Sequence, residues 1–438
     1  MTGWRSCWPL RVAHKPQGGS SNASAALAAD VLSKVLQGRT LTQALETASL
    51  NPTRRGAVLD MVYGALRYKG TLEAVLAQLL KKPLDDKFTH ALLLAALYLL
   101  AYTQEAPYAV VDNAVKSAPR HLKGLVNAVL RNFSRQREAQ LEAAQETQAG
   151  RTNFPDWWVD KLRQAYPEKW QAILAASQQH PPMTLRVNRR KTDVEAYRAE
   201  LQASGQTSRQ TGAVALTLGK PVAVDKLPGF LDGRVSVQDA GAQWAARLLD
   251  VQDGMRVLDA CAAPGGKTGH ILESANAAVL ALDADAQRLV RVQQNLDRLG
   301  LAAELKAGDA GRPQAWWNGR PFDRILADVP CSASGVVRRN PDIKWLRRPQ
   351  DIAKFAGQQA VILDALWQTL APGGKLLYAT CSIFPEENAQ QIKSFVARHA
   401  DAVLLALPPE LGDGQLLPDD DHDGFYYALL QRAQTKAE

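Results

Sequence analysis

The 438-residue chain has little cysteine and no long apolar run, and both shortages exclude classes of protein. Its four cysteines are Cys7, Cys261, Cys331 and Cys381. They are too few and too scattered for a disulfide framework, and none has a spacing typical of zinc ligands. The longest apolar run, Ala91 to Ala101, is shorter than the ~18–20 residues of a membrane span and predicts a buried helix. The N-terminus also lacks the apolar core of a signal peptide. We therefore expect a cytoplasmic protein that binds no metal and no membrane.

The net charge of +8 is unevenly distributed. Residues 1–150 hold 18 basic and 11 acidic side chains, residues 151–235 hold 13 and 8, and residues 236–438 hold 21 and 25. This distribution suits a front part that binds a polyanion, joined to a catalytic domain. The alternative is a solvated basic surface without a partner.

The front part contains a basic run, Asn113 to Arg137, with no acidic residue. Its basic residues are Lys116, Arg120, Lys123, Arg131, Arg135 and Arg137. Single basic residues are usually solvated, but six without a counter-charge favour contact with a phosphate backbone.

Hydrophobic periodicity predicts a chain of several domains. Residues 1–24 are expected to be a disordered extension and residues 25–145 an all-helical domain. Its helices are expected at Ala25–Leu36, Ala57–Leu66 and Leu72–Leu80. Residues 150–235 are expected to form a small α+β module. Its strands are expected at Thr184–Asn188, Ala213–Leu218 and Pro221–Val224, with a helix at Val194–Ser204.

Residues 236–435 alternate strands with helices, which predicts an α/β domain with a doubly wound sheet. Four expected strands end in aspartate: Arg256–Asp259, Ala278–Asp283, Ala303–Asp309 and Phe322–Asp328. A fifth is expected at Lys375–Thr380, after a helix at Ala360–Leu370. One aspartate after a strand is usually a helix cap or a turn residue. Four are more specific, because this fold gathers its strand ends around one ligand crevice.

The turn after the first of these strands is rich in small residues and runs from Ala260 to Lys267. Glycines let a ligand approach the backbone, and the following helix offers free N–H groups to a carboxylate. The turn is neither GxGxxG nor GxxxxGK[ST], so it does not favour a dinucleotide or a P-loop phosphate. Asp283 stands 24 residues after Asp259, a spacing that suits a carboxylate on ribose hydroxyls.

Two cysteines follow strands of the same domain. Cys331 lies in Asp328-Val329-Pro330-Cys331, and Cys381 lies in the run Thr380 to Asn388. Either cysteine alone is more simply a small buried hydrophobe. Two of them, each followed by serine and close to a glycine-rich turn, indicate thiol chemistry.

These three motifs, in this order, resemble those of the RNA cytosine-5 methyltransferase family. Asp60–Arg67, Lys82–Leu84 and Gly124–Arg131 resemble the NusB-like helical domain fused to bacterial small-subunit ribosomal RNA methyltransferases of type B. The likeness extends from about residue 25 to residue 432. Val329 departs from it, since the family usually has alanine there.

The resemblance implies a Rossmann-like class I methyltransferase domain that binds S-adenosylmethionine. Its implied cofactor residues are Ala260, Cys261, Ala262, Ala263, Pro264, Gly265, Gly266, Lys267, Asp283, Asp309 and Asp328. It further implies that Cys381 is the nucleophile, that Cys331 assists product release and that Asp328 contacts the base. Addition of a thiolate to carbon 6 makes carbon 5 of cytosine nucleophilic. The implied substrate is a cytosine of 16S ribosomal RNA, and we expect a monomeric enzyme.

Three further points remain open on the sequence alone. Arg338, Arg339 and Lys344 form a basic run after Cys331, which predicts either an RNA path or a surface helix start. Cytosine-5 DNA methyltransferases use the Pro-Cys cysteine as nucleophile, so only the resemblance divides the roles of the two thiols. The alternatives are an RNA-binding protein with a vestigial methyltransferase fold, and the same chemistry on tRNA.

Overall fold

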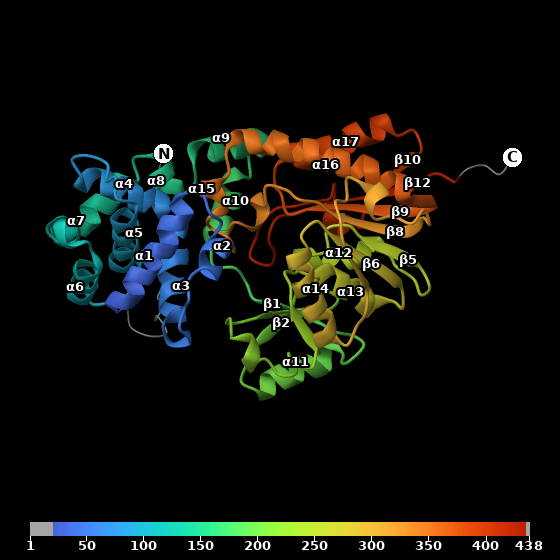
Figure 1. The fold of residues 1–438 in the computed structure, drawn as a ribbon, viewed down its shortest axis with the longest axis horizontal. Helices are drawn as coiled ribbons and strands as arrows, with labels where there is room; N and C mark the ends of the chain where they lie inside the picture. The colour runs from blue at the N-terminus through green and yellow to red at the C-terminus, as the bar shows by residue number, and fades with distance from the viewer. Residues whose placement is uncertain (1–20, 435–438) are drawn as a thin grey trace. The chain divides into compact units, whose positions relative to one another are not determined.

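The computed structural model describes residues 21–434, which divide into two compact units (Figure 1). The first unit contains the chain up to Gln164 together with Asn340–Arg347. The second contains Ala165–Arg339 and the chain from Arg348 onward. Residues 1–20 of the expected extension lie outside the described residues. The expectation was wrong for residues 22–24, because Ser21 caps a helix that begins at Asn22.

The first unit is helical, as predicted. Its longer helices are α1 Asn22–Leu36, α3 Pro52–Arg67, α4 Lys69–Leu79, α5 Lys87–Tyr102, α6 Pro107–Ser117 and α7 Lys123–Ala144, with short α2 Leu41–Glu46 and α8 Gln148–Thr152. Polar caps start several of them: Asn51 caps α3 ahead of Pro52, and Asp86 caps α5. Such caps satisfy N–H groups that have no partner within the helix.

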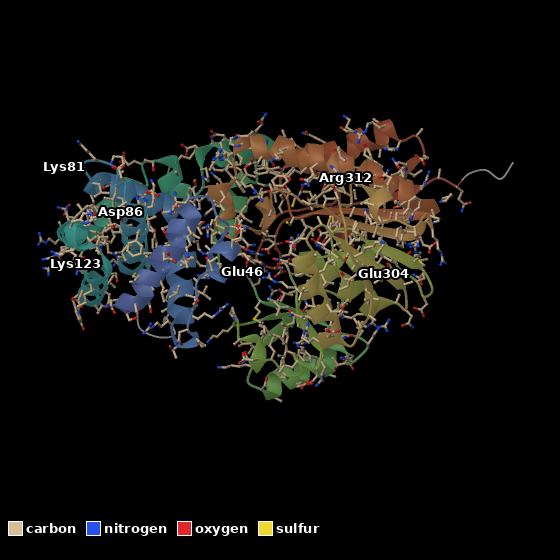
Figure 2. The ribbon with its side chains drawn as sticks, in the orientation of Figure 1. Glu46, Lys81, Asp86, Lys123, Glu304 and Arg312 are labelled. Atoms are coloured by element: carbon tan, nitrogen blue, oxygen red, sulfur yellow. The ribbon has the colours of Figure 1, made fainter. Side chains whose placement is uncertain are left out.

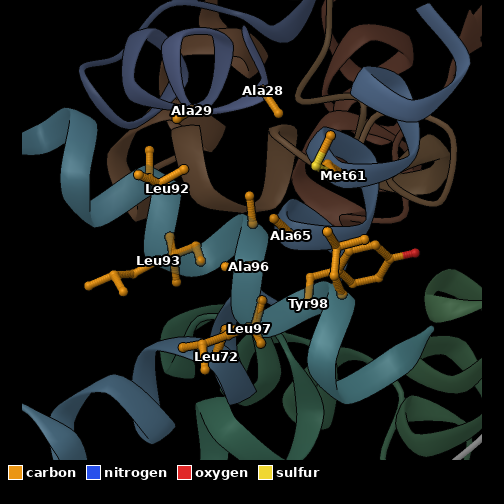
Figure 3. Close-up of a cluster of buried hydrophobic side chains, with 14 of the residues drawn as sticks. Ala28, Ala29, Met61, Ala65, Leu72, Leu92, Leu93, Ala96, Leu97 and Tyr98 are labelled. Carbon is orange, nitrogen blue, oxygen red and sulfur yellow. The ribbon is translucent and has the colours of Figure 1, made fainter. Parts of the chain in front are cut away.

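Helix α5 is the centre of this unit. Ala91–Ala101 is buried along its whole length, which confirms the helix predicted from the apolar run. Figure 3 shows Leu92, Leu93 and Ala96 of α5 among residues of the neighbouring helices. Within residues 21–434, no helix is both long and apolar enough to cross a membrane.

A segment from the second half of the sequence completes the helical unit. Residues Asn340–Arg347 contain α15, Ile343–Leu346, and pack against the core of the first unit. Asp342 Oδ2 accepts a hydrogen bond from the N–H of Leu41 at 2.9 Å, and Trp345 Nε1 donates to the carbonyl of Leu66 at 2.7 Å. Sequence patterns did not indicate this packing, because residues 236–435 were expected to form one continuous domain.

The small module in the second unit is a four-stranded antiparallel sheet in the order β2-β3-β1-β4. The strands are β1 Thr184–Val187, β2 Ser208–Gln210, β3 Ala215–Leu218 and β4 Val235–Val237, with helices α10 Trp170–Gln178 and α11 Val194–Ala203. The strand predicted at Pro221–Val224 is wrong. This segment is a loop that leads into the turn Val224–Lys226, and its proline has no N–H to donate to a ladder.

The larger sheet has the order β10-β12-β9-β8-β5-β6-β7, with β11 beside β12. Its strands are β5 Arg256–Asp259, β6 Ala278–Asp283, β7 Glu304–Ala307, β8 Phe322–Asp328, β9 Leu370–Thr380, β10 Ala402–Leu405, β11 Gln415–Leu416 and β12 Phe425–Arg432. Strands β5 to β9 pair in parallel, and β12 runs antiparallel to β9 and β10. The predicted doubly wound sheet is confirmed, with an antiparallel edge.

Helices cover both faces of this sheet (Figure 1). Helices α12 Trp244–Leu249, α13 Gly266–Ser274 and α14 Ala286–Leu299 share one core with Val257 of β5. Helices α16 Pro349–Thr369 and α17 Ala389–Arg398 share the other core with Leu258. Successive residues of a strand point to opposite faces, so one short strand serves both cores.

The strand order fixes where a ligand crevice lies. The chain builds outward from β5 to β6 and β7, then returns to the other side of β5 with β8 and β9. In such sheets ligands bind at the carboxyl ends of the strands beside this switch point. The expected motifs follow the ends of β5, β8 and β9, so the fold brings them to one edge.

Candidate active site

The glycine-rich turn links β5 to α13 at the switch point. Gly265 has a φ of +91°, and a Cβ there would lie 3.1 Å from the Cα of Val292, so both conformation and space require glycine. Thr268 Oγ1 donates to Asp259 Oδ2 at 2.7 Å and ties the turn to its strand. Burial raises the pKa of Asp259 to about 7. Asp259 therefore holds the turn through Thr268 and is itself buried.

Asp283 holds the same turn from the next strand. Its side chain is buried, and Oδ2 accepts from the N–H of Ala263 at 3.0 Å. Its Oδ1 accepts from the N–H of Asp285 at 3.1 Å. Asp309 lies differently, because β7 ends at Ala307, two residues before the end predicted from the sequence. Asp309 is exposed, and its Oδ1 accepts from the N–H of Gly311 at 2.9 Å.

The two cysteines come together after adjacent strands. Asp328 of β8 pairs with Ala379 of β9, so the residues that follow each strand emerge side by side. The Sγ atoms of Cys331 and Cys381 lie 3.4 Å apart. Cys331 and Cys381 are both of intermediate exposure, as is Cys261, so their closeness and not their exposure distinguishes them.

Asp328 faces the glycine-rich turn. Its Oδ2 accepts from Lys267 Nζ at 2.6 Å, and both side chains are largely buried. Burial lowers the pKa of Lys267, but the carboxylate of Asp328 outweighs it and the net shift is upward. The structure thus places a charged pair between the turn after β5 and the cysteine after β8.

The chemical state of Cys331 is set by its surroundings. The hydrogen bond with Cys381, burial and the nearby charge of Glu387 all raise the pKa of the Cys331 thiol. Cys331 is therefore held as a protonated thiol. The third cysteine, Cys261, also has a raised pKa, chiefly because it is buried, and its side chain belongs to a hydrophobic core.

A buried cluster behind the thiols was not assigned from the sequence. It consists of Ser332, Ser334, Ser382 and Glu387, all fully buried. The signal was present, because each cysteine is followed by serine and Glu387 lies six residues after Cys381. Glutamate side chains are usually exposed, so the pattern alone did not indicate that Glu387 is buried.

The basic run of the helical unit is only partly free of acidic partners. Lys116 Nζ pairs with Asp112 Oδ2 at 2.6 Å, and Asp112 stands one residue before the run. Arg137 donates to the carbonyl of Ala101 at 2.5 Å. The exposed members are Lys116, Arg120, Lys123, Arg131 and Arg135, of which Lys116 has the ion pair with Asp112. Figure 2 shows Lys123 at the surface of the helical unit.

The basic run after Cys331 is mostly internal, contrary to the expectation of an RNA path. Arg338 is 1% exposed and forms an ion pair with Asp423, which also pairs with Arg339. Lys344 is 1% exposed and donates to the carbonyl of Arg67 at 3.1 Å. Arg338 and Lys344 cannot reach a phosphate from these positions. Asp423 pairs with Arg338, whereas burial and the nearby charges of Arg67 and Lys69 lower the pKa of Lys344. Sequence spacing did not reveal either environment.

Three family models match successive parts of the chain. Residues 23–135 match the NusB family, and residues 154–225 match a ferredoxin-like domain of RsmF/B-like methyltransferases. Residues 246–431 match 16S rRNA methyltransferase RsmB/F. These matches agree with the helical unit, the four-stranded module and the larger sheet.

Curated relatives match almost the whole chain. "Ribosomal RNA small subunit methyltransferase B" of Vibrio vulnificus is 46% identical over 419 residues, covering 92% of this chain and 98% of the relative. The protein of that name from Vibrio cholerae is 46% identical over 424 residues, covering 94% and 98%.

Among solved structures, PH0851 has a TM-score of 0.76 at 22% identity and covers 93% of this chain and 99% of its own. NSun6 from Pyrococcus horikoshii with SFG has a TM-score of 0.57 at 20% identity and covers 64% and 99%. These two show the shared fold.

Fold, motif geometry and family matches together define an S-adenosylmethionine-dependent methyltransferase that carries a NusB-type helical domain. More narrowly, the chain belongs to the ribosomal RNA small subunit methyltransferase B family.

Proposed function

We propose that this enzyme transfers a methyl group from S-adenosylmethionine to carbon 5 of a cytosine in 16S ribosomal RNA, through a covalent Cys–cytosine intermediate. The observation that carries the proposal is the 3.4 Å separation of the Cys331 and Cys381 Sγ atoms beside the glycine-rich turn. A single nucleophilic step needs one thiol. Two adjacent thiols suit a reaction in which one adds to the base and the other takes part in release.

The described residues fit the cofactor. The turn from Ala260 to Gly266 leads into α13, and a Cβ on Gly266 would have only Gln238 Nε2 within 4 Å, at 3.9 Å. Such an open backbone at the start of a helix suits the carboxylate of an amino-acid group. We assign Asp283 to the ribose and the exposed Asp309 to the base of the nucleoside. When bound, S-adenosylmethionine supplies the electrophilic methyl group.

Cys381 is the nucleophile in this proposal. Its thiolate adds to carbon 6 of the cytosine, forming an S–C6 bond and making carbon 5 nucleophilic. The raised pKa of Cys331 supports this division, because a thiol that keeps its proton is not the attacking thiolate. After methyl transfer, Cys331 gives its proton to solvent and, as a thiolate, takes the proton from carbon 5. The electrons of the C5–H bond form the C5–C6 double bond, and the S–C6 bond breaks to return the Cys381 thiolate.

Asp328 contacts the base in this proposal, and Lys267 positions Asp328. A hydrogen bond or proton at N3 of the cytosine assists thiol addition. Asp328 lies between the turn and Cys331 along the chain and contacts Lys267 at 2.6 Å. The lysine fixes the carboxylate in place, so that Asp328 meets the base close to the transferred methyl.

The relatives and the helical unit support 16S ribosomal RNA as the substrate. Relatives that share 46% identity are named for the ribosomal small subunit RNA, and their length is matched almost completely. We assign RNA binding to the exposed residues Arg120, Lys123, Arg131 and Arg135 of residues 25–145, with the module 150–235 and the domain 236–435 completing the enzyme. We also infer that it acts as a monomer.

Incubation of the purified enzyme with unmethylated 16S ribosomal RNA and S-adenosylmethionine tests the proposal. Nuclease digestion and mass spectrometry should detect 5-methylcytidine in the RNA, and bisulfite sequencing should place it at one position. Transfer RNA in a parallel reaction is the control for the alternative substrate. Methylation of tRNA alone, or of a base other than cytosine, would overturn the assignment.

A further inference from the structure

Glu387 is a carboxylate buried between the two cysteine turns. It is fully buried, in the turn Pro385–Glu387 that follows β9. Its Oε1 accepts from the N–H of Ser332 at 2.7 Å, and its Oε2 accepts from the Ser332 and Ser382 hydroxyls at 2.5 and 2.6 Å. Ser332 follows Cys331 and Ser382 follows Cys381, so one side chain holds both turns.

The serines connect the turns a second time. Ser334 Oγ lies 3.0 Å from Ser332 Oγ and 3.0 Å from Ser382 Oγ, and it accepts from the N–H of Ile383 at 2.9 Å. Each hydroxyl has one proton to donate. If Ser332 and Ser382 both donate to Glu387, the Ser334 proton is left to bridge them. With Ser332 and Ser382 as donors, Glu387 accepts from both hydroxyls.

Helix α16 also contributes to this cluster. Gln359 Nε2 donates to Glu387 Oε1 at 3.1 Å and to the carbonyl of Pro330 at 2.9 Å, just before Cys331. Glu387 therefore receives four donors, which is the number of lone-pair sites on an ionised carboxylate. Burial raises the pKa of Glu387, and the hydrogen bonds from Ser332 and Ser382 oppose that rise.

Burying a carboxylate costs free energy, which the four donors to Glu387 offset. Removing a charge from water costs several kcal/mol unless hydrogen bonds compensate. Backbone turns elsewhere in this protein are held more simply, for example by Asn188, whose side chain bonds the N–H of Arg190 and the carbonyl of Gly233. What distinguishes Glu387 is that it reaches both cysteine turns.

We propose that Glu387 is the positioning residue of the thiol pair, which fixes the Cys331 and Cys381 turns at one separation so that the reaction passes from addition at one thiol to release at the other. This inference rests on the proposed function. Glu387 acts on the thiols through Ser332 and Ser382, which directly follow Cys331 and Cys381 in the chain. Its negative charge also disfavours a thiolate at Cys331, which keeps the two thiols chemically different.

Two variants of Glu387 separate its hydrogen bonds from its charge. Glu387→Gln keeps the size but presents an amide donor to hydroxyl and N–H donors. We expect kcat to fall about 100-fold or more, as for a misplacement of ~1 Å, with KM for RNA and cofactor affinity within about two-fold. The covalent RNA adduct should also accumulate on denaturing gels. Glu387→Asp keeps the charge but shortens the side chain, so it should lose rate without changing the ionisation of Cys331.

The pH dependence of Cys331 alkylation supplies a readout that a structural role would not move. Iodoacetamide modification of the Cys331 peptide, followed by mass spectrometry, should shift to lower pH in Glu387→Gln. It should not shift in Glu387→Asp or in the exposed control Glu410→Gln. An unshifted profile in Glu387→Gln would contradict the charge effect.

Two serine variants test the positioning role even if Glu387→Gln misfolds and loses cofactor binding. Ser332→Ala and Ser382→Ala each remove one donor to Glu387 and should each lower kcat at least ten-fold with normal cofactor affinity. Wild-type rates in both would overturn the positioning role. Cys381→Ala runs in parallel: if it stays active, the proposed function fails, whereas an inactive Cys381→Ala beside normal Glu387 and serine variants defeats only the inference.

Discussion

At the scale of single residues, the proposed reaction needs two thiols with different roles. The structure adds to the sequence a reason for the difference: Cys331 is held protonated by Cys381, by burial and by Glu387. The sequence motifs identified both cysteines but left their roles to resemblance. Sequence patterns did not identify Glu387 as a site residue, because a carboxylate is rarely buried. Only the packing around α16 and β9 shows that this one is buried.

The division of labour between the thiols gives the first prediction. Cys381→Ala should abolish methyl transfer and leave cofactor binding intact, because the attacking group is lost and the turn after β5 is not. Cys331→Ala should bind RNA and cofactor, add to the base and then stall. A filter assay of labelled methyl transfer and a denaturing gel measure the two outcomes. Equal adduct levels in the two variants would contradict the roles assigned here.

Asp259 gives a pH prediction at the same scale. Its pKa is raised to about 7 in the folded protein from an ordinary 3.8, so the folded state favours the protonated form. The stability from this group is full below about pH 4 and is lost as the pH rises toward 7. Asp259→Asn should therefore gain stability relative to the wild type between pH 5 and pH 8. Denaturant unfolding at pH 5 and pH 8 measures the difference in free energy of unfolding between the variant and the wild type. The same difference at both pH values would contradict a raised pKa of Asp259.

At the scale of elements, one arginine joins the small module to the glycine-rich turn. Arg186 of β1 is buried and donates to Glu273 of α13 at 2.9 and 2.7 Å. The same guanidinium donates to the carbonyl of Gly266 at 2.6 Å, where α13 begins. The module thus supports the cofactor turn as well as extending the chain's basic surface.

Arg186→Lys should weaken cofactor binding about ten-fold, because an ammonium group lacks the planar fork that spans Glu273 and Gly266. Isothermal titration with S-adenosylhomocysteine measures the affinity. Arg298→Lys is the matched control, since Arg298 also joins the larger sheet to the module, through the carbonyls of Phe230 and Val235, but does not contact the turn. The same loss of affinity in both variants would point to general destabilisation.

The elements also show how far sequence patterns reach. The strands β5, β6 and β8 matched their predicted bounds because apolar runs end in aspartate there. Strand β7 is shorter than the predicted strand Ala303–Asp309 at both ends. The strand predicted at Pro221–Val224 is wrong, since a proline-led loop can have the composition of a strand. The packing of Asn340–Arg347 into the helical unit was invisible, because it depends on contacts with residues some 300 positions earlier, such as Asp342 with Leu41.

At the scale of the whole molecule, charge separates a basic helical part from a mildly acidic catalytic part. Burial removes Arg338 and Lys344 from the candidate RNA-binding residues, and the proposal keeps the exposed ones. Arg131 and Arg135 lie on α7 on either side of Phe133, and both are exposed.

Replacing Arg131 and Arg135 together with glutamine should weaken RNA binding and flatten its salt dependence. Each lost phosphate contact should reduce the slope of log K against log salt by about 0.7–0.9. Filter binding at several salt concentrations measures the slope. Arg398→Gln, an exposed arginine of α17 that pairs with Asp364, is the control and should leave it unchanged. An unchanged slope in the double variant would leave α7 as solvated surface.

The most direct test of the central claim is to trap and map the covalent intermediate. The Cys331→Ala enzyme is incubated with 16S ribosomal RNA and S-adenosylmethionine, digested with nuclease and protease, and examined by mass spectrometry. The account predicts a methylated cytidine nucleotide attached to the peptide that contains Cys381. No adduct, or an adduct on a peptide that lacks Cys381, would contradict it.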